Sequence, residues 1–541
     1  LVVGGGAIRV WDLKQGKVVR QIPHAPRHLA LFPDGKAVAT SDGASMRVWD
    51  LTTGRDRHAL GGPENALKAV AWSPDNRTVA TWSWNGDVFL WDVVTGKTLY
   101  RFDVPAHRNV AFSPDGKLLA GATGGRLCVW DTATGKEVGP FKAHPSQPHH
   151  VAFTPDGKAL VTMDFDDESV RRWDLATGQE RLLFHLTPPD KKVRRHRFTT
   201  MAFSPEARLM ALAEDRLDRT TALFGECDVY VYDVTTGKQL HRLKKHKNQL
   251  WALAFAPDGR VLVTAGRRFG GEGIILWDTA TGKVIGSLPD GVDYGLAFSR
   301  DGRSFAAATR GTPICVWETA TLRERCRFGG HPREGIYALA FAPDGRALIS
   351  AGGDTTALVW DLTGLRRGQR LPALRLTPGE VEALWNDLQG DDAARAWRAI
   401  WKLAAAPADS LPALRKHLRP VPLPDAGKLA RWIEELGSAK FAVRQRASQE
   451  FEKLGEVATP ALRKALAGQV PEETRRRIEQ LLARVENPAG GPGVLRMLRA
   501  LEAVEHGGTD EARQFLRALA EGAPGARLTR EARAALERLR P

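Results

Sequence analysis

The sequence predicts an all-β domain of about eight four-stranded antiparallel sheets, followed by an all-α domain of short stacked helices. Three observations carry this prediction. A Trp-Asp string followed by a Thr-Gly turn recurs up to residue 361, a Pro-Asp-Gly string recurs between its copies, and after Gly364 the spacing of apolar residues becomes helical. The repeat also explains why the 541 residues include 16 Trp but only 5 Tyr.

The Trp-Asp motif marks nine successive repeats. Its copies begin at Trp11, Trp49, Trp91, Trp130, Trp173, Tyr232, Trp277, Trp317 and Trp360, at spacings of 38, 42, 39, 43, 59, 45, 40 and 43 residues. Short β-branched runs between the copies indicate strands. Pro-Asp-Gly and Thr-Gly supply the fixed and positive φ angles of tight turns, so each repeat should hold four short antiparallel strands. Stacking such sheets radially buries both of their apolar faces.

This double periodicity resembles the WD-repeat β-propeller family over residues 1–361. The resemblance implies an all-β propeller domain within residues 1–365. We expect eight blades over residues 23–361, with residues 1–22 a partial repeat; a chain cut from two tandem propellers is the alternative. The family's buried hydrogen-bond relay is well matched in the last repeat alone, by His331, Ser350, Asp354 and Trp360.

The remaining residues change to a helical pattern. Residues 377–380 form a capping box with proline at the first helical position, and the Pro-rich residues 420–424 form a linker. We therefore expect a helical segment with its linker over 366–424 and a second helical domain over 425–541. Residues 442–468 resemble a HEAT-type helical repeat, which implies stacked helix pairs; a plain helical bundle is the alternative.

Composition excludes several classes of protein. With 43% hydrophobic and 26% charged residues the chain is globular, and no apolar run approaches the roughly 18 residues that a membrane helix needs. The net charge of +15 is mixed and spread over both halves, which disfavours a specific nucleic-acid binder. Four distant cysteines predict reduced thiols and fit the cytoplasm. Because the chain starts at Leu1 with no signal-like segment, we expect it to begin inside a longer protein.

No catalytic, cofactor or metal site is predicted. The glycines at residues 4–6 lead into a strand and not into the helix that a phosphate loop requires. The acidic cluster of Asp164, Asp166, Asp167 and Glu168 lacks the spacing of an EF-hand and is interpreted as a solvated turn. His144, His149 and His150 are interpreted as incidental. A site assembled from distant loops stays an open alternative.

Three insertions crowd one sector of one rim of the predicted propeller. They fall at residues 185–198, 213–228 and 267–273, in connections that emerge on the same face of a blade. Surface drift without function is the alternative to a binding sector. The candidate partner-binding residues are basic or aromatic: Lys191, Lys192, Arg194, Arg195, Arg197, Phe198, Arg216, Arg219, Phe224, Arg267, Arg268 and Phe269.

These observations favour a non-enzymatic scaffold that binds protein partners, with an acidic protein segment expected at the insertions. The chain is expected to be monomeric apart from its partners, without a cofactor and without a membrane. The alternatives are a propeller enzyme and a basic nucleic-acid-associated protein. The domain order also resembles bacterial WD-repeat proteins, common in planctomycetes, that carry a helical tail. That resemblance implies the docking or sensory part of a larger regulatory protein.

Overall fold

The computed structural model divides the chain into a β unit that ends at Leu362 and a helical unit that begins at Thr363. It describes the strands within residues 1–50 and residues 66–539, except 84–85, 104–109, 124–125, 140, 142–147, 165–166, 187–196, 218–223, 247–248, 267–272, 290–291, 310–312, 330, 332–334, 366–370 and 486–491. The two units are taken here one at a time.

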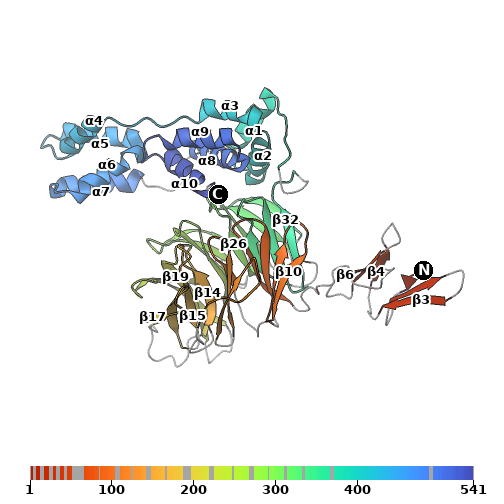
Figure 1. Ribbon diagram of the computed structural model, residues 1–541. Helices are drawn as coiled ribbons and strands as arrows, with labels where there is room; N and C mark the ends of the chain where they lie inside the picture. Colours follow the sequence, from red (N-terminus) through yellow and green to blue (C-terminus); the bar gives the residue numbers. More distant parts are fainter. Residues whose placement is uncertain are drawn as a thin grey trace. The chain divides into compact units, whose positions relative to one another are not determined.

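Seven antiparallel sheets of the β unit stand around one axis, and we call them blades 1–7 (Figure 1). Blade 1 holds β7 (Leu67–Trp72), β8 (Thr78–Ser83), β9 (Asp87–Asp92) and β10 (Thr98–Asp103); blade 2 holds β11 (Val110–Phe112), β12 (Leu118–Thr123) and β13 (Arg126–Asp131). Blade 3 holds β14 (Pro148–Phe153), β15 (Ala159–Asp164), β16 (Ser169–Asp174) and β17 (Glu180–His185); blade 4 holds β18 (Arg197–Phe203), β19 (Leu209–Leu217), β20 (Phe224–Asp233) and β21 (Gln239–His246). Blade 5 holds β22 (Leu250–Phe255), β23 (Val261–Gly266), β24 (Ile274–Asp278) and β25 (Val284–Leu288). Blade 6 holds β26 (Val292–Phe298), β27 (Ser304–Thr309), β28 (Ile314–Glu318) and β29 (Glu324–Phe328); blade 7 holds β30 (Ile336–Phe341), β31 (Ala347–Gly352) and β32 (Ala357–Asp361).

The ring closes with seven blades, so the prediction of eight blades over residues 23–361 is wrong. The strand β30 of blade 7 lies beside β7 of blade 1, which leaves no place for another sheet. The first two repeats instead form separate three-stranded sheets: β1 (Val2–Val3), β2 (Ile8–Asp12) and β3 (Lys17–Ile22), then β4 (His28–Leu31), β5 (Ala37–Ser41) and β6 (Met46–Asp50). Sequence periodicity counts repeats, whereas ring closure depends on the angle at which neighbouring sheets pack.

The two turn motifs close their hairpins by side-chain hydrogen bonds. In the Ser-Pro-Asp-Gly turn of blade 2, the Ser113 hydroxyl donates to the Asp115 carboxylate at 2.6 Å and accepts from the backbone of Leu118 at 2.9 Å. In the following Trp-Asp turn, Asp131 accepts from the backbone and hydroxyl of Thr134 at 2.8 Å each. Gly135 then takes a φ of 67°, a conformation in which glycine is unstrained.

Blades pack on one another through rings and β-branched side chains. The outer strand of one blade places an aromatic ring on the third strand of the next blade: Phe102 stacks on Trp130 with ring centroids 4.9 Å apart, and Phe184 stacks on Tyr232 at 6.1 Å. Buried residues of β8 and β9 join those of β12 and β13 in one cluster. Each blade therefore buries its faces against its two neighbours.

The helical unit begins with the expected capping box, in which the Thr377 backbone donates to Glu380 and the Glu380 backbone donates to the Thr377 hydroxyl. Its helices are α1 (Pro378–Asp387), α2 (Ala393–Ala405), α3 (Pro407–His417), α4 (Ala426–Leu436), α5 (Phe441–Leu454), α6 (Thr459–Ala467), α7 (Glu472–Val485), α8 (Pro492–Gly507), α9 (Asp510–Ala520) and α10 (Arg527–Arg538), with a 3-10 turn at Gly455–Ala458.

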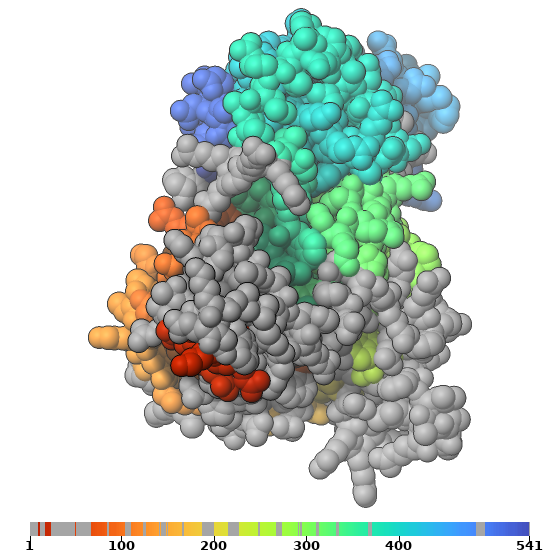
Figure 2. Space-filling view, turned by 90° about the vertical axis from the view of Figure 1, so that its right-hand side faces the viewer, coloured from red at the N-terminus to blue at the C-terminus, as the bar shows by residue number. Residues whose placement is uncertain are grey.

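Two groups of helices share apolar cores within this unit. The helices α4–α7 enclose one core, which includes the fully buried Phe451 and Ile478. The helices α1–α3 pack with α8–α10, and α1–α3 form the teal face of the unit in Figure 2. The buried Arg499 of α8 donates at 2.8 Å to the carbonyls of Leu388 and Gly390, which satisfies carbonyl groups that follow α1.

Candidate interaction face of the propeller

Most of the sequence-predicted binding residues fall outside the described part of the chain. For Arg197, Arg216 and Phe224 the structure gives a backbone position on β18, β19 and β20. Phe198 is half-buried and packs against a core cluster that contains Met201. The positions not described are Lys191, Lys192, Arg194, Arg195, Arg219, Arg267, Arg268 and Phe269.

The insertion between the second and third strands of blade 4 lengthens a hairpin. Here β19 has nine residues and β20 has ten, whereas β8 and β9 of blade 1 have six each. Leu217 pairs with Phe224 near the tip, and Arg197 at the start of β18 pairs with Asp215. The structure therefore brings the ends of two insertions to the same end of blade 4. We call the end of the propeller that carries these connections the loop rim.

The base of this hairpin holds buried charged groups that are paired. The buried carboxylates of Glu214 and Asp228 face each other across the pair β19–β20. Arg242 of the outer strand β21 donates to Asp228 at 2.9 Å, and the Tyr230 hydroxyl lies 3.5 Å from the same carboxylate. Burial, and then the neighbouring Glu214, raises the pKa of the Tyr230 hydroxyl well above its usual range. Ion pairs of this kind hold the hairpin in one conformation.

The inner strands carry a feature that the sequence reasoning missed. In five blades the first strand has one extra residue without a cross-strand partner, a β-bulge that redirects a side chain. We call these residues the bulge row: Lys68, His149, Thr199, Trp251 and Tyr337. Each stands four residues before the aromatic residue that ends its strand. This constant spacing could have identified the bulge row from the sequence.

Lys68 and Tyr337 of the bulge row meet where the ring closes. The Lys68 ammonium lies 3.3 Å from the centre of the Tyr337 ring, which is a cation–π contact between blades 1 and 7. Burial lowers the pKa of Lys68 to about 8. Among its members with described side chains, the row contains a cation and two aromatic rings but no carboxylate. It lies on the loop rim because each of its strands follows an inter-blade connection.

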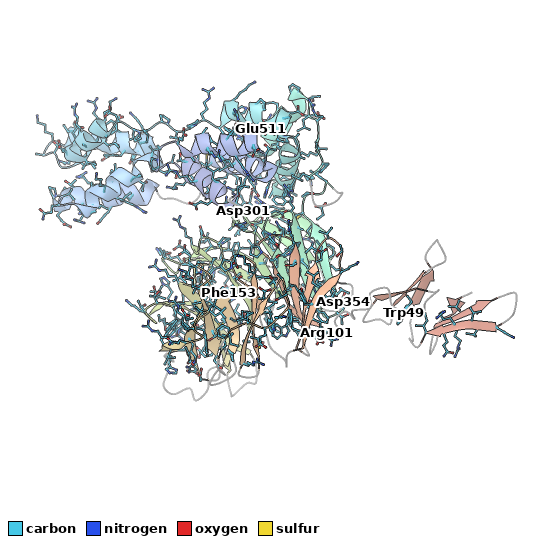
Figure 3. All side chains as sticks on the ribbon, in the orientation of Figure 1. Trp49, Arg101, Phe153, Asp301, Asp354 and Glu511 are labelled. Atoms are coloured by element: carbon cyan, nitrogen blue, oxygen red, sulfur yellow. The ribbon has the colours of Figure 1, made fainter. Side chains whose placement is uncertain are left out.

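The four residues of the expected relay lie in series in blade 7. The indole of Trp360 donates to Ser350 at 2.8 Å, Ser350 and His331 Nε2 are 2.8 Å apart, and His331 Nδ1 lies 2.8 Å from Asp354, which follows β31 (Figure 3). Burial acts to raise the pKa of Asp354, but hydrogen bonds from His331 and Thr356 outweigh it and hold the pKa below its usual range.

This Ser–His–Asp series has the distances of a hydrolase triad but not its surroundings. Ser350 and His331 are each 0% exposed, and the Ser350 oxygen is already the acceptor of the Trp360 indole. A nucleophile must be reachable by its substrate, so the arrangement is structural. A shorter relay that the sequence reasoning missed joins blades 4 and 5. Thr264 of β23 contacts His246, which ends β21, at 2.6 Å and accepts from the Trp277 indole at 2.9 Å.

The other clusters weighed from the sequence carry no site in the described residues. Asp167 accepts from the backbone of Ser169 at 2.9 Å and from the Arg171 guanidinium at 3.0 Å, as a turn residue does. Asp164, in contrast, ends β15 and is fully buried, so its interpretation as part of a solvated turn is wrong. His144 and Asp166 lie outside the described residues. Among the helices that the structure describes, none combines the length and the apolar character needed to cross a bilayer.

Comparison with known proteins agrees with the repeat. The family model "WD domain, G-beta repeat" matches residues 54–92, 97–131, 237–278 and 322–361. The propeller is built from WD repeats. Human WD repeat-containing protein 90 is 40% identical over 362 residues, which cover 54% of this chain and 20% of that protein. Small ribosomal subunit protein RACK1y of Oryza sativa subsp. japonica is 31% identical over 140 residues, 24% of this chain and 41% of that protein.

A third relative is the transcription factor unc-37 of Caenorhabditis elegans, 26% identical over 271 residues, 48% of this chain and 40% of that protein. The chain thus spans less than half the length of each of these relatives. What they share with it is the WD-repeat propeller.

Proposed function

We propose that this protein is a non-enzymatic scaffold that binds an acidic protein segment at the loop rim. The observation that carries the proposal is the lengthened hairpin β19–β20, which projects from a WD-repeat propeller on the same rim as the bulge row. Lys68, Trp251 and Tyr337 offer a cation and aromatic rings without a carboxylate among them. The basic and aromatic residues of the three insertions would extend that surface, and such residues are favoured at binding hot spots.

The test is a charge reversal on the full chain. One variant changes Lys191, Lys192, Arg194 and Arg195 to Glu. The control changes four exposed lysines that follow turns at the opposite ends of the strands: Lys117, Lys136, Lys158 and Lys238. Partners captured from lysate are identified, purified and titrated against both variants. We expect the first variant to lose at least about tenfold in affinity and the control to stay within twofold, roughly, of the intact chain.

Salt dependence distinguishes the alternatives. Nucleic-acid binding loses affinity with a slope of about −0.9 per neutralised phosphate, whereas a contact anchored by aromatic rings depends on salt only weakly. Equal binding by both variants contradicts the proposed site, and a steep slope supports the nucleic-acid alternative.

Two finer proposals accompany this one. We infer HEAT-type stacking for α5–α7, supported by the core that α4–α7 share. We also propose that the chain is the docking part of a larger bacterial regulatory protein, which rests on its resemblance to WD-repeat proteins with helical tails. Sequencing of the gene decides this second point, since a kinase or DNA-binding domain encoded in the same reading frame would support it.

A further inference from the structure

The connection between α3 and α4 has the burial pattern of a polyproline II helix. Figure 1 shows residues 418–424 as an extended trace between these two helices. Leu418 is 4% exposed, Val421 and Pro424 are half-buried, and the four residues between them are exposed. Burial therefore recurs every third residue, and three residues per turn is the period of polyproline II. The backbone is extended at both ends, with φ −99° and ψ 107° at Leu418 and φ −61° and ψ 116° at Asp425.

This segment is anchored along its length. The Leu418 backbone donates to the Leu414 carbonyl at 2.8 Å, and Asp425 accepts from the backbone of Lys428 at 2.9 Å as the N-cap of α4. In the middle, the Ala523 backbone donates to the Val421 carbonyl at 2.8 Å. The anchors hold the segment in its extended form before any partner arrives, which lowers the entropic cost of binding.

The outward side of the segment is apolar with a cation at one end. We call it the proline ridge: Arg419, Pro420, Pro422 and Leu423. Leu423 is 69% exposed, the largest exposed fraction among the big apolar side chains of the described residues. A polyproline II segment has three faces, and one face of this segment packs on the helices. Two residues per turn therefore point outward. Their apolar side chains form two steps that lie one turn apart.

We propose that the proline ridge is a docking site for a partner domain that has an aromatic-lined groove for polyproline II segments and an acidic group beside it. Aromatic grooves bind preformed polyproline II through successive apolar steps. Arg419 supplies the charge that would fix the direction of binding, and the exposed Arg415 and Lys416 precede it. This surface is independent of the loop rim, so the two proposals can fail separately.

The experiment titrates the full chain with purified SH3, WW and EVH1 domains and follows binding by fluorescence anisotropy. We expect saturable binding to at least one class, competed by a synthetic peptide of residues 416–425. The double change Pro422→Ala with Leu423→Ala should weaken that binding at least about tenfold. The matched control is Pro412→Ala, because Pro412 is exposed on α3 but lies outside the ridge.

Circular dichroism should show the same helix content and melting temperature for the ridge variants, because the changed side chains are exposed. Pro412→Ala replaces a proline inside α3 with a better helix former, so its melting temperature should be equal or higher. A second arm changes Arg419 to Glu and should weaken the same complex. Failure of all three domain classes to bind the intact chain overturns the proposal. So does equal affinity of the double variant and the intact chain.

Discussion

Two interfaces of the propeller differ although the same repeat builds both. Between blades 1 and 2, Phe102 stacks on Trp130, the Tyr100 ring covers Gly135 and the Tyr100 hydroxyl donates to the Ala133 carbonyl at 2.6 Å. Between blades 7 and 1, which we call the seam, a cavity of about 270 Å³ lies against Trp91, Gly96 and Val359. No described atom lies within 4 Å of the position that a Cβ on Gly96 would take, and Val359 is 53% exposed.

The difference follows from how the chain connects the blades. The family match at 97–131 begins at β10, the outer strand of blade 1, and ends at β13, the third strand of blade 2. One repeat therefore spans two blades and links them covalently. At the seam the chain leaves blade 7 at Leu362 for the helical unit, and blade 7 has three described strands instead of four. Lys68 on Tyr337 is the polar contact that bridges the seam.

The largest effect on the free energy of unfolding is expected when the tryptophans of the two interfaces are replaced by alanine. Trp130 is 4% exposed and stacked, so Trp130→Ala should cost about 3–5 kcal/mol of unfolding free energy. Trp91 faces the cavity, so Trp91→Ala should cost at least about 1 kcal/mol less. Chemical denaturation of the two variants measures both values. Equal losses would mean that the seam is packed as tightly as the other interface.

The next largest effect on stability is expected for a change in the relay of blade 7. Asp354→Ala removes the carboxylate that accepts from the buried His331 Nδ1, which then keeps only a weaker neutral partner, the Thr356 hydroxyl at 3.1 Å; the change should cost about 1–3 kcal/mol. Because the pKa of Asp354 is held low in the folded protein, its contribution is present above the unfolded pKa and is lost as the pH falls through the folded one. Denaturation at pH 7 and near pH 3 should therefore show the variant and the intact chain converging in acid. A cost that is the same at both pH values would contradict this origin.

Hydrogen exchange should differ between the third strands of blades 1 and 7, because a described strand pairs with the outer edge of the first and not of the second. The outer edge of β9 is paired with β10, whereas no described strand pairs with the outer edge of β32. Amides of β32 should exchange faster than those of β9, because an open edge leaves its backbone groups in water. Mass spectrometry of peptic peptides from the intact protein makes the comparison. Equal protection would show that another segment covers β32.

The smallest effect concerns the contact across the seam. Lys68→Met removes the cation–π interaction, which contributes about 0.5–1 kcal/mol at a partly exposed site, but it also removes the desolvation cost of the ammonium. The two effects oppose each other, so the net change near pH 7 should be small. The pKa of Lys68 is lowered to about 8, so the folded state releases its proton before the unfolded state does. The intact chain should therefore gain stability relative to the variant as the pH rises above 8 toward the unfolded value. A difference that shrinks over that window would contradict the low pKa.

The sequence predicted the parts of the fold that depend on local chemistry. Asp115 forms its hydrogen bonds within one turn, Asp131 and Gly135 belong to another, and the capping box at Thr377 lies within one helix. The spacing of these residues in the sequence is therefore enough to predict the turns and the helix start. The number of blades depends on contacts between β7 and β30, which are far apart in the chain, and periodicity does not encode it. His246 was missed because the connection between β23 and β24 of blade 5, residues 267–273, contains no Asp, although the hydroxyl and indole partners of His246 stand at the expected positions.

The place of the lengthened hairpin was predictable from the sequence, whereas binding at the loop rim stays a prediction. Insertion lengths pointed to blade 4, and the structure shows the lengthened hairpin there. The bulge row was hidden because a bulge is a property of paired strands and not of one strand. Phe198 was selected as an aromatic anchor, but it packs against the core cluster that contains Met201, because the bulge at Thr199 shifts the alternation of β18 by one residue.

The proposed binding of partners at the loop rim can be tested by hydrogen exchange of the full chain, with and without a purified captured partner. We predict that protection on binding concentrates in peptides that cover the hairpin β19–β20 and the bulge row at Lys68, Trp251 and Tyr337. Protection confined to the opposite end of the blades, at the turns around Asp115 and Asp131, would contradict the claim.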